Sequence, residues 1–539
     1  MRLSPFRHRS SPSGRHQALW LVPLLLALVL AHGLLARPHH PASSLKLTAT
    51  PRGHSEAVVN AASSAPRSTT SAPVVGASLV PRGSLRRLPT SFSGMSTESW
   101  DVEALDSDPL AVKRVLNLLK VPGDGGLMLR VGGQSTEQTY WDAPKLGVGS
   151  EAYRPGLHWL KTLASLTRAS RLRVLVDLNL VARSPSMAAA LAKSLVHYMP
   201  AGSIAGLEVG NEPDIGHRQV VNPLAPAGET VPKTPKGWDS YTSTQYVSLF
   251  RSYANAVHRV ARSLRLVGPE VFFAGRDVSW VKQLVRAQRS RLSMVTVHRY
   301  PLSACTSSTA GDYATTARVL GQNASGGMAN ELVKAVRLAR STGLPLRLSE
   351  FNSVTCGGKT GVSNTFATAL WAPDTMFSMW NVGVSGINIH LAPGQSNAAF
   401  SISPSGLTPS PLLYGMLMFT RATGSGAKLA PVRTSGTSAH NVKVWAVRAS
   451  KNILKVLVLD KGRGVVKAAL HLGNHGTATI QRLIAPSPSA TTGVTLAGQH
   501  LGAQGQWVGR RVMPRVNPAR GTYTVTMPAY SAALITVHT

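Results

Sequence analysis

The sequence predicts an α/β fold, in which a (β/α)8 TIM barrel is followed by a C-terminal antiparallel β-sandwich domain. The chain has 539 residues, more than one hydrophobic core usually supports. Eight short apolar runs alternate with amphipathic helical stretches over residues 88–422, as expected for repeated βα units. The residues after 422 form β-rich segments separated by turn residues, as in a sandwich. A doubly wound sheet is the alternative, although such sheets commonly have about six strands.

The first 36 residues predict a signal peptide or a membrane anchor. Four arginines precede an apolar run from Ala18 to Ala36, which is the layout of a secretory signal. Its uninterrupted part, Ala18 to Ala31, has the length of a signal-peptide core, whereas the whole run is just long enough to span a bilayer. We therefore expect an exported protein that is either secreted or anchored at the outer face of the membrane.

Two segments separate this region from the barrel. Residues 37–73 are rich in Ser, Ala, Pro, Thr and His, which predicts a disordered linker. Residues 74–87 contain a strand-like stretch, Val74 to Val80. We expect this strand to join the β-sandwich although it precedes the barrel.

The barrel, residues 88–422, has eight expected strands and a set of expected helices. The strands are expected around Ser91–Gly94, Leu127–Val131, Arg173–Leu178, Ala205–Gly210, Val271–Gly275, Met294–His298, Leu346–Ser349 and Ser385–His390. The helical candidates include Met187–Met199, Gln245–Arg262, Glu331–Arg340, Thr365–Trp380 and Leu412–Arg421.

The sandwich, residues 423–539, has five expected β segments. They are Val442–Arg448, Ile453–Asp460, Val465–His471, Thr477–Ile484 and Thr522–Val537. Its only carboxylate is that of Asp460, so acid/base chemistry is expected in the barrel.

The strongest chemical signal follows the fourth strand, in the segment LEVGNEPD at residues 207–214. Active sites of such barrels lie at the C-terminal ends of the strands. The Asn-Glu-Pro sequence predicts Glu212 at the barrel mouth, because Pro213 ends the strand. Asn211 is expected to hydrogen-bond a sugar hydroxyl, and Glu208 is interpreted as a buried structural acid. A capping or turn role for Asn-Glu-Pro is the alternative.

A second carboxylate closes the seventh strand, in the segment LRLSEFN at residues 346–352. Taken alone, Glu350 is equally compatible with a helix cap or a salt bridge. Together with Glu212 it provides the pair that hydrolysis of a glycosidic bond needs, one group to protonate the leaving oxygen and one to attack or to activate water. Strands four and seven face each other across a barrel mouth. A separation of about 5–5.5 Å predicts retention of configuration, and a wider gap predicts inversion.

Three further side chains are expected to support this pair. Tyr300, after the sixth strand, is predicted to hydrogen-bond Glu350, and His298 is predicted to line the pocket. Arg130, on the second strand, is predicted to pair with Glu350 or another carboxylate and to lower its pKa. Ordinary packing at the barrel rim is the alternative for Tyr300 and His298, and a purely structural role of Met128 to Val131 is the alternative for Arg130. Weaker candidates, more typical of barrel-core or cap residues, are Asp177, Asn179 and Asp277.

The only cysteines are Cys305 and Cys356, which are too few for a disulfide framework. An oxidising compartment would let them pair. Both follow predicted strands, so if those strands are neighbours a disulfide would tie two active-site loops together. Two unpaired thiols are the alternative.

The formal net charge of +34 is extreme. Residues 1–90 hold eleven Lys or Arg and one acid, Glu56, so about +10 precedes the barrel and about +24 remains. Such a field concentrates anionic ligands such as uronic-acid glycans; solubility in an acidic environment is the alternative explanation. The chain shows no nucleic-acid module, no phosphate loop around Gly132-Gly133, no HExxH and no clustered Cys and His. We therefore expect no nucleic-acid partner, no cofactor and no metal.

The two carboxylate motifs, their order and the trailing sandwich resemble the clan A retaining glycosidases. More narrowly, the chain resembles glycoside hydrolase family 79, which includes bacterial β-glucuronidases and heparanase, from about Val74 to the C-terminus. The most specific motif is EFNSVTCGG at residues 350–358. Family members carry a glycine pair at this distance after the nucleophile, and its backbone N–H groups receive the uronic-acid carboxylate. The resemblance implies that Gly357 and Gly358 form this cradle.

One residue departs from the family pattern. Ile389 stands where heparanase offers a tyrosine hydroxyl to the same carboxylate, with His390 or a loop tyrosine as a candidate replacement. This departure weakens the expectation of a uronic-acid substrate and keeps a neutral sugar open.

We therefore expect a retaining β-glycosidase that acts by double displacement, with Glu212 as acid/base and Glu350 as nucleophile. The expected substrates are glucuronides or glycans that contain glucuronic acid. A neutral-sugar β-glycosidase, a transglycosylase and a non-catalytic carbohydrate-binding surface protein are the alternatives. Acceptor assays would separate the transglycosylase, and the retained acid pair argues against a mere binding protein.

Overall fold

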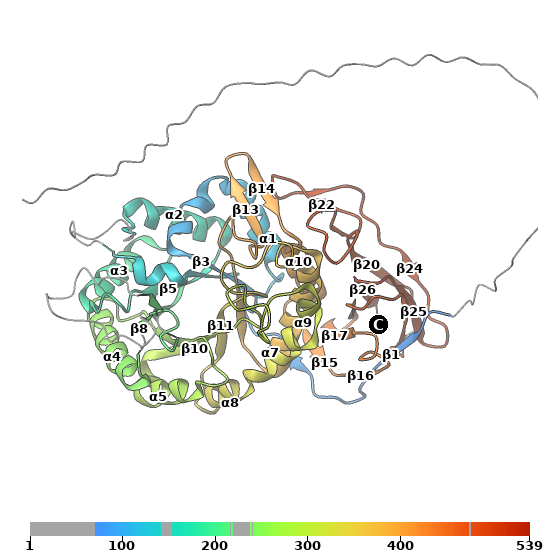
Figure 1. Ribbon diagram of the computed structural model, residues 1–539, viewed down its shortest axis with the longest axis horizontal. Helices are drawn as coiled ribbons and strands as arrows, with labels where there is room; N and C mark the ends of the chain where they lie inside the picture. The colour runs from blue at the N-terminus through green and yellow to red at the C-terminus, as the bar shows by residue number, and fades with distance from the viewer. Residues whose placement is uncertain are drawn as a thin grey trace, which may run out of the picture. The chain divides into compact units, whose positions relative to one another are not determined.

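The computed structural model describes residues 71–141, 153–215, 241–473 and 476–538, together with the backbone of 217–218 and 238–239. The expected signal peptide or anchor and nearly all of the expected linker lie outside the described residues. Within the described ranges, no helix combines the length and the apolarity that crossing a membrane requires. Residues 70–539 form one compact unit, which Figure 1 shows as a ribbon.

Parallel strands close into a barrel in the first part of this unit (Figure 1). The strands are β3 (Gly94–Glu98), β4 (Met128–Gly132), β5 (Arg173–Leu178), β6 (Ile204–Val209), β9 (Leu266–Val271), β10 (Leu292–His298), β11 (Leu346–Phe351) and β12 (Gly386–His390). Their order around the barrel is β10-β11-β12-β3-β4-β5-β6-β9. The predicted (β/α)8 barrel is confirmed, and the doubly wound alternative is wrong.

Two of the predicted strands lie elsewhere than expected. The first strand begins at Gly94 rather than Ser91, and the fifth, β9, ends at Val271 where the predicted strand begins. Pro269 argues against a strand interior because it has no N–H to donate. It fits because β6 pairs with β9 only at Leu266 and Val267, so the ladder on that side has ended before the proline. The shift brings Glu270 into the barrel interior, where it is fully buried.

Helices lie around the outside of the barrel strands (Figure 1). They are α1 (Pro109–Leu119), α2 (Leu157–Ser170), α3 (Pro185–Tyr198), α4 (Ser243–Val260), α5 (Val278–Gln288), α6 (Thr316–Leu320), α7 (Gly326–Glu331), α8 (Val333–Ser341), α9 (Phe366–Val382) and α10 (Pro411–Ala422). Side-chain caps define several starts: Asp108 accepts the N–H of Ala111, and Thr242 and Gln245 form a capping box on α4. Short 3-10 turns are Ser99–Asp101, Ala104–Asp106, Gln134–Gln138, Arg289–Arg291 and Gln322–Ala324.

Two sheets form the predicted sandwich, and most of their strands follow the barrel in the sequence. One sheet contains β16 (Val432–Ser435), β1 (Val74–Leu79), β19 (Val466–His471) and β25 (Thr522–Met527). The other contains β2 (Arg86–Arg87), β15 (Lys428–Ala430), β17 (Val442–Ser450), β18 (Ile453–Asp460), β26 (Ser531–His538), β20 (Ala478–Ile484) and β21 (Thr495–Leu496), with β24 (Arg515–Val516) against β20. Short pairs elsewhere are β7 (His217–Arg218) with β8 (Trp238–Asp239), β13 (Phe400–Ser403) with β14 (Gly406–Pro409), and β22 (His500–Leu501) with β23 (Trp507–Val508).

The two ends of the described chain meet in the sandwich. β1 pairs in parallel with β19 and antiparallel with β16, so the strand expected at 74–80 does lie in a sandwich sheet. The single segment predicted at 522–537 is two strands, because the chain turns at Tyr530, which has a positive φ. These strands lie in different sheets, and the apolar side chains between the sheets form a core of their own.

A buried polar cluster connects the barrel helix α9 with the sandwich. Asp374 on α9 accepts hydrogen bonds from the Lys461 ammonium at 2.8 Å, the Trp445 indole at 3.0 Å and the Ser325 hydroxyl at 2.7 Å. Both charged side chains are fully buried. Because α9 is covered on all sides, it lacks the polar stripe of a surface helix.

Candidate active site

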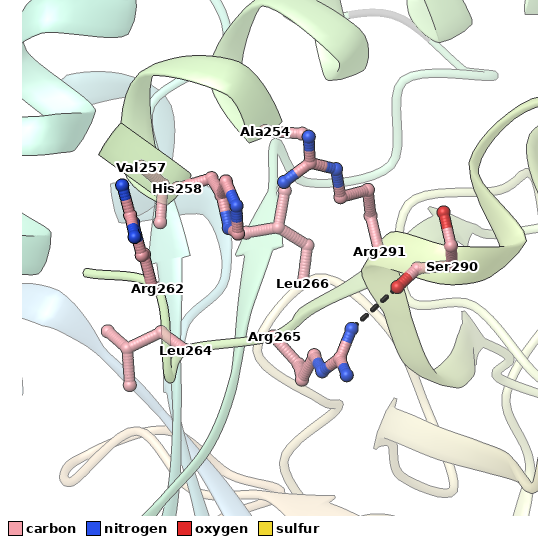
Figure 2. A pocket seen from close by; sticks show the side chains of 9 residues that line it. All are labelled: Ala254, Val257, His258, Arg262, Leu264, Arg265, Leu266, Ser290 and Arg291. Atoms are coloured by element: carbon pink, nitrogen blue, oxygen red, sulfur yellow. Dashed lines mark hydrogen bonds between the residues drawn. The ribbon is translucent and has the colours of Figure 1, made fainter. Parts of the chain in front are cut away.

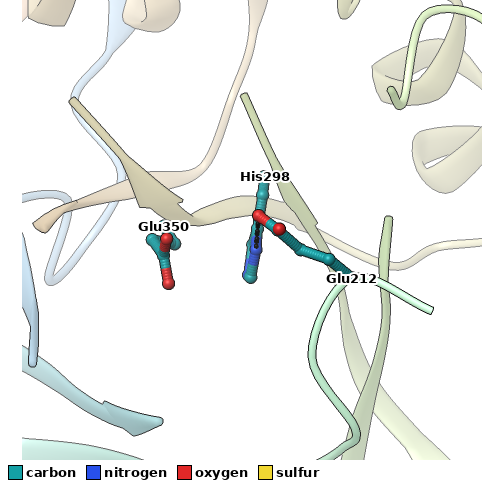
Figure 3. Close-up of side chains that lie close together, drawn as sticks. All are labelled: Glu212, His298 and Glu350. Carbon is teal, nitrogen blue, oxygen red and sulfur yellow. Dashed lines mark hydrogen bonds and ion pairs between the residues drawn. The ribbon is translucent and has the colours of Figure 1, made fainter. Parts of the chain in front are cut away.

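Glu212 and Glu350 lie at the C-terminal ends of barrel strands, where TIM-barrel active sites are built. Glu350 is the fifth residue of β11. Glu212 follows β6 by three residues, and both Gly210 and Glu212 have positive φ values, of 85° and 46°. This sharp turn directs the Glu212 side chain toward His298 on β10, as Figure 3 shows.

The two carboxylates are close together and largely shielded from solvent. One oxygen of Glu212, one of Glu350 and a ring nitrogen of His298 lie within 4.8 Å of one another. The side chains of Glu212 and Glu350 are 15% and 9% exposed. The carboxylates expected after strands four and seven therefore lie next to each other.

Glu350 is surrounded by groups that favour its ionised form. The Tyr300 hydroxyl donates to its Oε1 at 2.8 Å, Arg130 donates through Nη1 to its Oε2, and Nδ1 of His390 lies 3.8 Å from Oε2. Burial alone would raise the pKa of Glu350. The neighbouring His390, Arg130 and His298, with the Tyr300 hydrogen bond, outweigh burial and lower the pKa of Glu350 to about 2.

Glu212 has the opposite environment. Burial raises the pKa of Glu212 to about 7, and the charge of Glu350 acts in the same direction. The contact with His298 acts against this rise. The neighbouring carboxyl groups are thus pushed to opposite protonation states at mildly acidic pH, which is the usual sign of an acid and its partner base.

Arg130 lies beneath the pair and is fully buried among carboxylates. It contacts Asp177 at 2.6 Å, Glu208 at 3.0 Å and Glu270 at 3.2 Å. It also donates at 2.9 Å to the amide oxygen of Asn211. Asn211 therefore uses its oxygen inside the protein, and its amide nitrogen remains for a ligand in the pocket that it lines.

The pocket above these groups has a volume of about 330 Å³, near the lower end of the range for small-molecule sites. It is lined by Glu98, Gln134, Glu137, Gln138, Asn211, Glu212, Ile215, Phe272, Tyr300, Glu350, Thr355, Cys356, Gly357, His390, Gln395 and Asn397. His298 does not line it, contrary to the prediction: the ring is fully buried below Glu212. Ile389 is also fully buried, in the strand ladder next to His390.

The glycine pair contributes unequally to this pocket. Gly357 lines it, whereas the N–H of Gly358 already donates to the carbonyl of Thr355 at 3.1 Å. Both glycines have positive φ values, and a Cβ on Gly358 would lie 2.8 Å from the backbone nitrogen of Asn397. Gly358 therefore holds the turn, and Gly357 is the member of the pair that faces a ligand.

The loops after β10 and β11 are joined by a disulfide. Cys305 and Cys356 are bonded, with a Cα–Cα separation of 6.2 Å, which confirms the predicted pair. Because Cys356 precedes Gly357 and lines the pocket, the disulfide fixes the position of the pocket wall.

Sequence reasoning missed three buried acids near the site. Glu98 ends β3, and its Oε1 lies 3.6 Å from Nε2 of His390. Glu137 accepts the N–H groups of Leu180, Val181 and Asn211. Glu270 contacts Arg130 and His298. The misplaced ends of β3 and β9 concealed Glu98 and Glu270, whereas Glu137 lies in a 3-10 turn that carries no sequence signal.

The weaker candidates are structural. Asp177 binds Arg130, and Asn179 donates to the carbonyls of Glu137 and Thr139. Asp277 forms a surface ion pair with Arg276. Asp177, Glu208 and Glu270 also offer oxygens at a spacing that suits a metal ion. The Arg130 guanidinium already supplies a cation among them, so we do not assign them, or Glu212, His298 and Glu350, as metal ligands.

A second pocket of about 280 Å³ lies at the opposite end of the barrel, where β9 begins. Arg262, Arg265 and Arg291 surround His258 there, and Arg265 donates to the carbonyl of Ser290 (Figure 2). No carboxylate lines this pocket. It therefore lacks the acid pair of the pocket at the barrel mouth.

Comparison with known proteins identifies the C-terminal domain first. Residues 438–534 match the family described as "Glycosyl hydrolase family 79 C-terminal beta domain". No protein of curated function matches the chain in sequence.

Several solved structures share the fold. A 4-O-α-L-rhamnosyl-β-D-glucuronidase from Fusarium oxysporum 12S has a TM-score of 0.69 at 19% identity, covering 86% of this chain and 100% of its own. A GH51 arabinofuranosidase from Xanthomonas axonopodis pv. citri has a TM-score of 0.60 at 16% identity, covering 86% and 99%. An α-L-arabinofuranosidase from Thermotoga maritima has a TM-score of 0.59 at 14% identity, covering 86% and 100%. The C-terminal domain thus matches a glycoside hydrolase family 79 domain, and the chain shares its barrel-and-sandwich fold with these solved structures.

Proposed function

We propose that this protein is a retaining β-glycosidase and, within that class, a β-glucuronidase. The observation that carries the proposal is the approach of Glu212 and Glu350 oxygens to within 4.8 Å. Retaining enzymes hold their carboxyl groups about 5–5.5 Å apart, because one must attack the sugar directly. Inverting enzymes need about 6.5–9.5 Å to admit a water molecule. The short separation supports retention.

The two carboxyl groups divide the reaction between them. Glu350, ionised, attacks the anomeric carbon, while Glu212, protonated, gives its hydrogen to the departing glycosidic oxygen. The glycosyl group is then esterified to Glu350, so the negative charge beside Glu212 is lost. Glu212, now ionised, takes a proton from water while the water oxygen bonds to the anomeric carbon and the bond from that carbon to Glu350 breaks. Glu350 leaves as a carboxylate, and the sugar is released with its original configuration.

The uronic-acid preference is supported by the pocket wall and by the charge of the chain. Gly357 lines the pocket, and a Cβ there would lie 3.3 Å from the amide carbon of Gln395. We propose that the Gly357 N–H and the Gln395 amide receive the sugar carboxylate. The net charge of +34 favours the approach of anions. Ile389 offers no hydroxyl, so a neutral sugar is the competing substrate.

A panel of nitrophenyl glycosides tests the proposal. The substrates are the β-D-glucuronide, the β-D-glucoside and the α-L-arabinofuranoside, each assayed with the wild type, Glu212→Gln and Glu350→Gln. Asp277→Asn is the matched control, because it removes one acid from the surface ion pair with Arg276. We expect glucuronide turnover that Asp277→Asn retains and both active-site variants lose.

Other results would redirect the assignment. Turnover of the glucoside alone would keep the acid pair and discard the uronic-acid site at Gly357. Transfer of the sugar to an added acceptor rather than to water would identify a transglycosylase. Silence on all three sugars, with binding of an acidic glycan retained, would favour the non-catalytic alternative.

A further inference from the structure

Below Glu212, a buried histidine lies between two carboxyl groups. Nδ1 of His298 is 3.1 Å from Oε1 of Glu212, and Nε2 is 3.2 Å from Oε1 of Glu270. The side chains of His298 and Glu270 are fully buried. The ring therefore connects the catalytic pair with a carboxyl group that no substrate can reach.

The surroundings of Glu270 fix which partner carries hydrogen. Nη2 of Arg130 donates to Oε2 of Glu270 at 3.3 Å, and the Ser349 hydroxyl donates to Oε1 at 3.4 Å. With donors on both oxygens the Glu270 carboxylate only accepts, so the His298 ring nitrogen that faces Oε1 must carry the hydrogen. In a neutral imidazole the other nitrogen, Nδ1, then has a lone pair.

Glu208 accounts for the remaining proton in the cluster. Burial raises the pKa of both Glu208 and Glu270 to about 8. Arg130 lowers the pKa of both, and the hydrogen bond between the two carboxyl groups raises that of Glu208 and lowers that of Glu270. Among the described residues Oε1 of Glu208 receives no donor, whereas both oxygens of Glu270 do, from Arg130 and Ser349. The geometry therefore favours the shared proton on Glu208 and the ionised form of Glu270.

We propose that Glu270 is a positioning residue for the acid/base: it holds a hydrogen on Nε2 of His298, so that Nδ1 accepts the hydrogen of the Glu212 carboxyl group. This inference rests on the proposed glycosidase function. Between turnovers the O–H of the Glu212 carboxyl group donates to Nδ1 of His298. When a substrate enters, the O–H turns to the glycosidic oxygen. After the transfer, the lone pair on Nδ1 faces the Glu212 carboxylate and makes it a stronger base toward water.

The opposite tautomer would work against catalysis. With hydrogen on Nδ1, His298 would donate to the Glu212 carboxylate and lower its pKa. Glu212 would then be ionised at a pH where the acid step needs its proton. Glu270 removes this donation by engaging the hydrogen on the other nitrogen, as a buried carboxylate does for the histidine of a catalytic triad.

Other charged groups face the same three side chains and remain in place when Glu270 is changed. Glu350 and Asp214 act on Glu212. The groups that act on Glu270 from neighbouring elements are Arg130 on β4, Asp177 on β5, Glu208 on β6 and Glu350 on β11, and the hydroxyl of Tyr246 on α4 is held by the carbonyl of Val209. None of these can replace the contact to Nε2 of His298.

The test compares Glu270→Gln with Glu208→Gln. Both remove a buried carboxyl group next to Arg130, but only Glu270 contacts His298. Each variant is assayed on β-glycosides with a dinitrophenyl aglycone, which leaves without acid assistance, and an alkyl aglycone, which requires it. For Glu270→Gln we expect the alkyl substrate to lose about 10-fold or more in kcat/KM beyond the dinitrophenyl loss. The basic limb of the pH profile moves to lower pH. Glu208→Gln keeps the wild-type ratio and limb.

Three results separate the possible failures. Equal losses on both aglycones with an unmoved basic limb would reduce Glu270 to a structural residue and overturn the inference alone. Full activity of Glu212→Gln on the alkyl substrate would instead overturn the proposed function. If Glu270→Gln does not fold, ¹⁵N NMR of the wild type decides, with the His298 signals assigned by their loss in His298→Asn. A ring with hydrogen on Nε2 supports the inference, and hydrogen on Nδ1 contradicts it.

Discussion

At the scale of single residues, the site gives opposite pKa shifts to two glutamates, whose ordinary side-chain pKa is near 4. Glu350 lies beside His390, Arg130 and Tyr300, and its pKa is lowered to about 2. Glu212 is kept protonated by burial, with its pKa raised to about 7. These opposite surroundings fit the proposed roles, Glu350 as nucleophile and Glu212 as acid.

These pKa values predict a bell-shaped dependence of kcat/KM on pH. Activity requires Glu350 ionised, so it rises as pH increases through about 2. It also requires Glu212 protonated, so it falls as pH increases through about 7. Initial rates on the nitrophenyl glucuronide between pH 3 and pH 9 measure the accessible basic limb. A rate that keeps rising above pH 8 would exclude Glu212 as the acid.

Tyr300→Phe should slow the enzyme about 10- to 100-fold, the kinetic equivalent of one lost hydrogen bond to a charged group. The hydroxyl donates to the ionised form of Glu350, so its loss raises the pKa of Glu350 and moves the acid limb to higher pH. Steady-state kinetics across pH measure both effects. An unchanged kcat would show that Tyr300 only packs against its neighbours, among them Phe272.

At the scale of elements, the strands determine which side chains meet, and sequence reasoning predicted this only in part. Glu212, Glu350, Tyr300 and Arg130 could be found because each stands beside a recognisable strand end. Glu270 could not, because Pro269 reads as a strand breaker and the early end of the β6–β9 ladder is a property of the closed barrel. The four carboxylates around Arg130 come from four different strands, and no local pattern reveals such a cluster.

The disulfide belongs to this scale, since it joins the loops after β10 and β11. The variant Cys305→Ser with Cys356→Ser should lose about 2–4 kcal/mol of unfolding free energy. It should also raise KM more than it lowers kcat, because Gly357 follows Cys356 in the pocket wall while the Glu212–Glu350 pair is held by strands. Chemical denaturation and steady-state kinetics measure the two effects. A fall in kcat at constant KM would contradict this division.

At the scale of the whole molecule, buried polar contacts connect the sandwich with the barrel helix α9. The sandwich sheets contain strands from both sides of the barrel in sequence, and Lys461 and Trp445 reach Asp374 on α9. The family match falls within this domain, whereas the candidate catalytic residues lie in the barrel. The alternation of apolar runs with helical stretches predicted the barrel, and the β-rich segments separated by turn residues predicted the sandwich. Neither pattern indicated the Asp374–Lys461 pair, because the two residues are 87 positions apart.

Asp374→Asn tests this connection. The substitution leaves the Lys461 ammonium buried without its counter-ion, so we expect a loss of about 3–5 kcal/mol in unfolding free energy. Asp374→Asn combined with Lys461→Met should recover part of that loss, since no buried charge remains. Calorimetry of these variants measures it, with Asp277→Asn as the exposed-pair control, for which about 0–1 kcal/mol is expected. Equal effects at the two pairs would contradict the role of the cluster.

Mass spectrometry of the trapped intermediate tests double displacement through Glu350 most directly. The protein is incubated with a 2-deoxy-2-fluoro-β-glucuronosyl fluoride, which reacts with a retaining nucleophile and releases slowly. We predict a mass increase of one fluoroglucuronosyl group, located by peptide mapping on Glu350 and absent in Glu350→Gln. A label on another residue, or no label from a protein that turns over the nitrophenyl glucuronide, would contradict double displacement through Glu350.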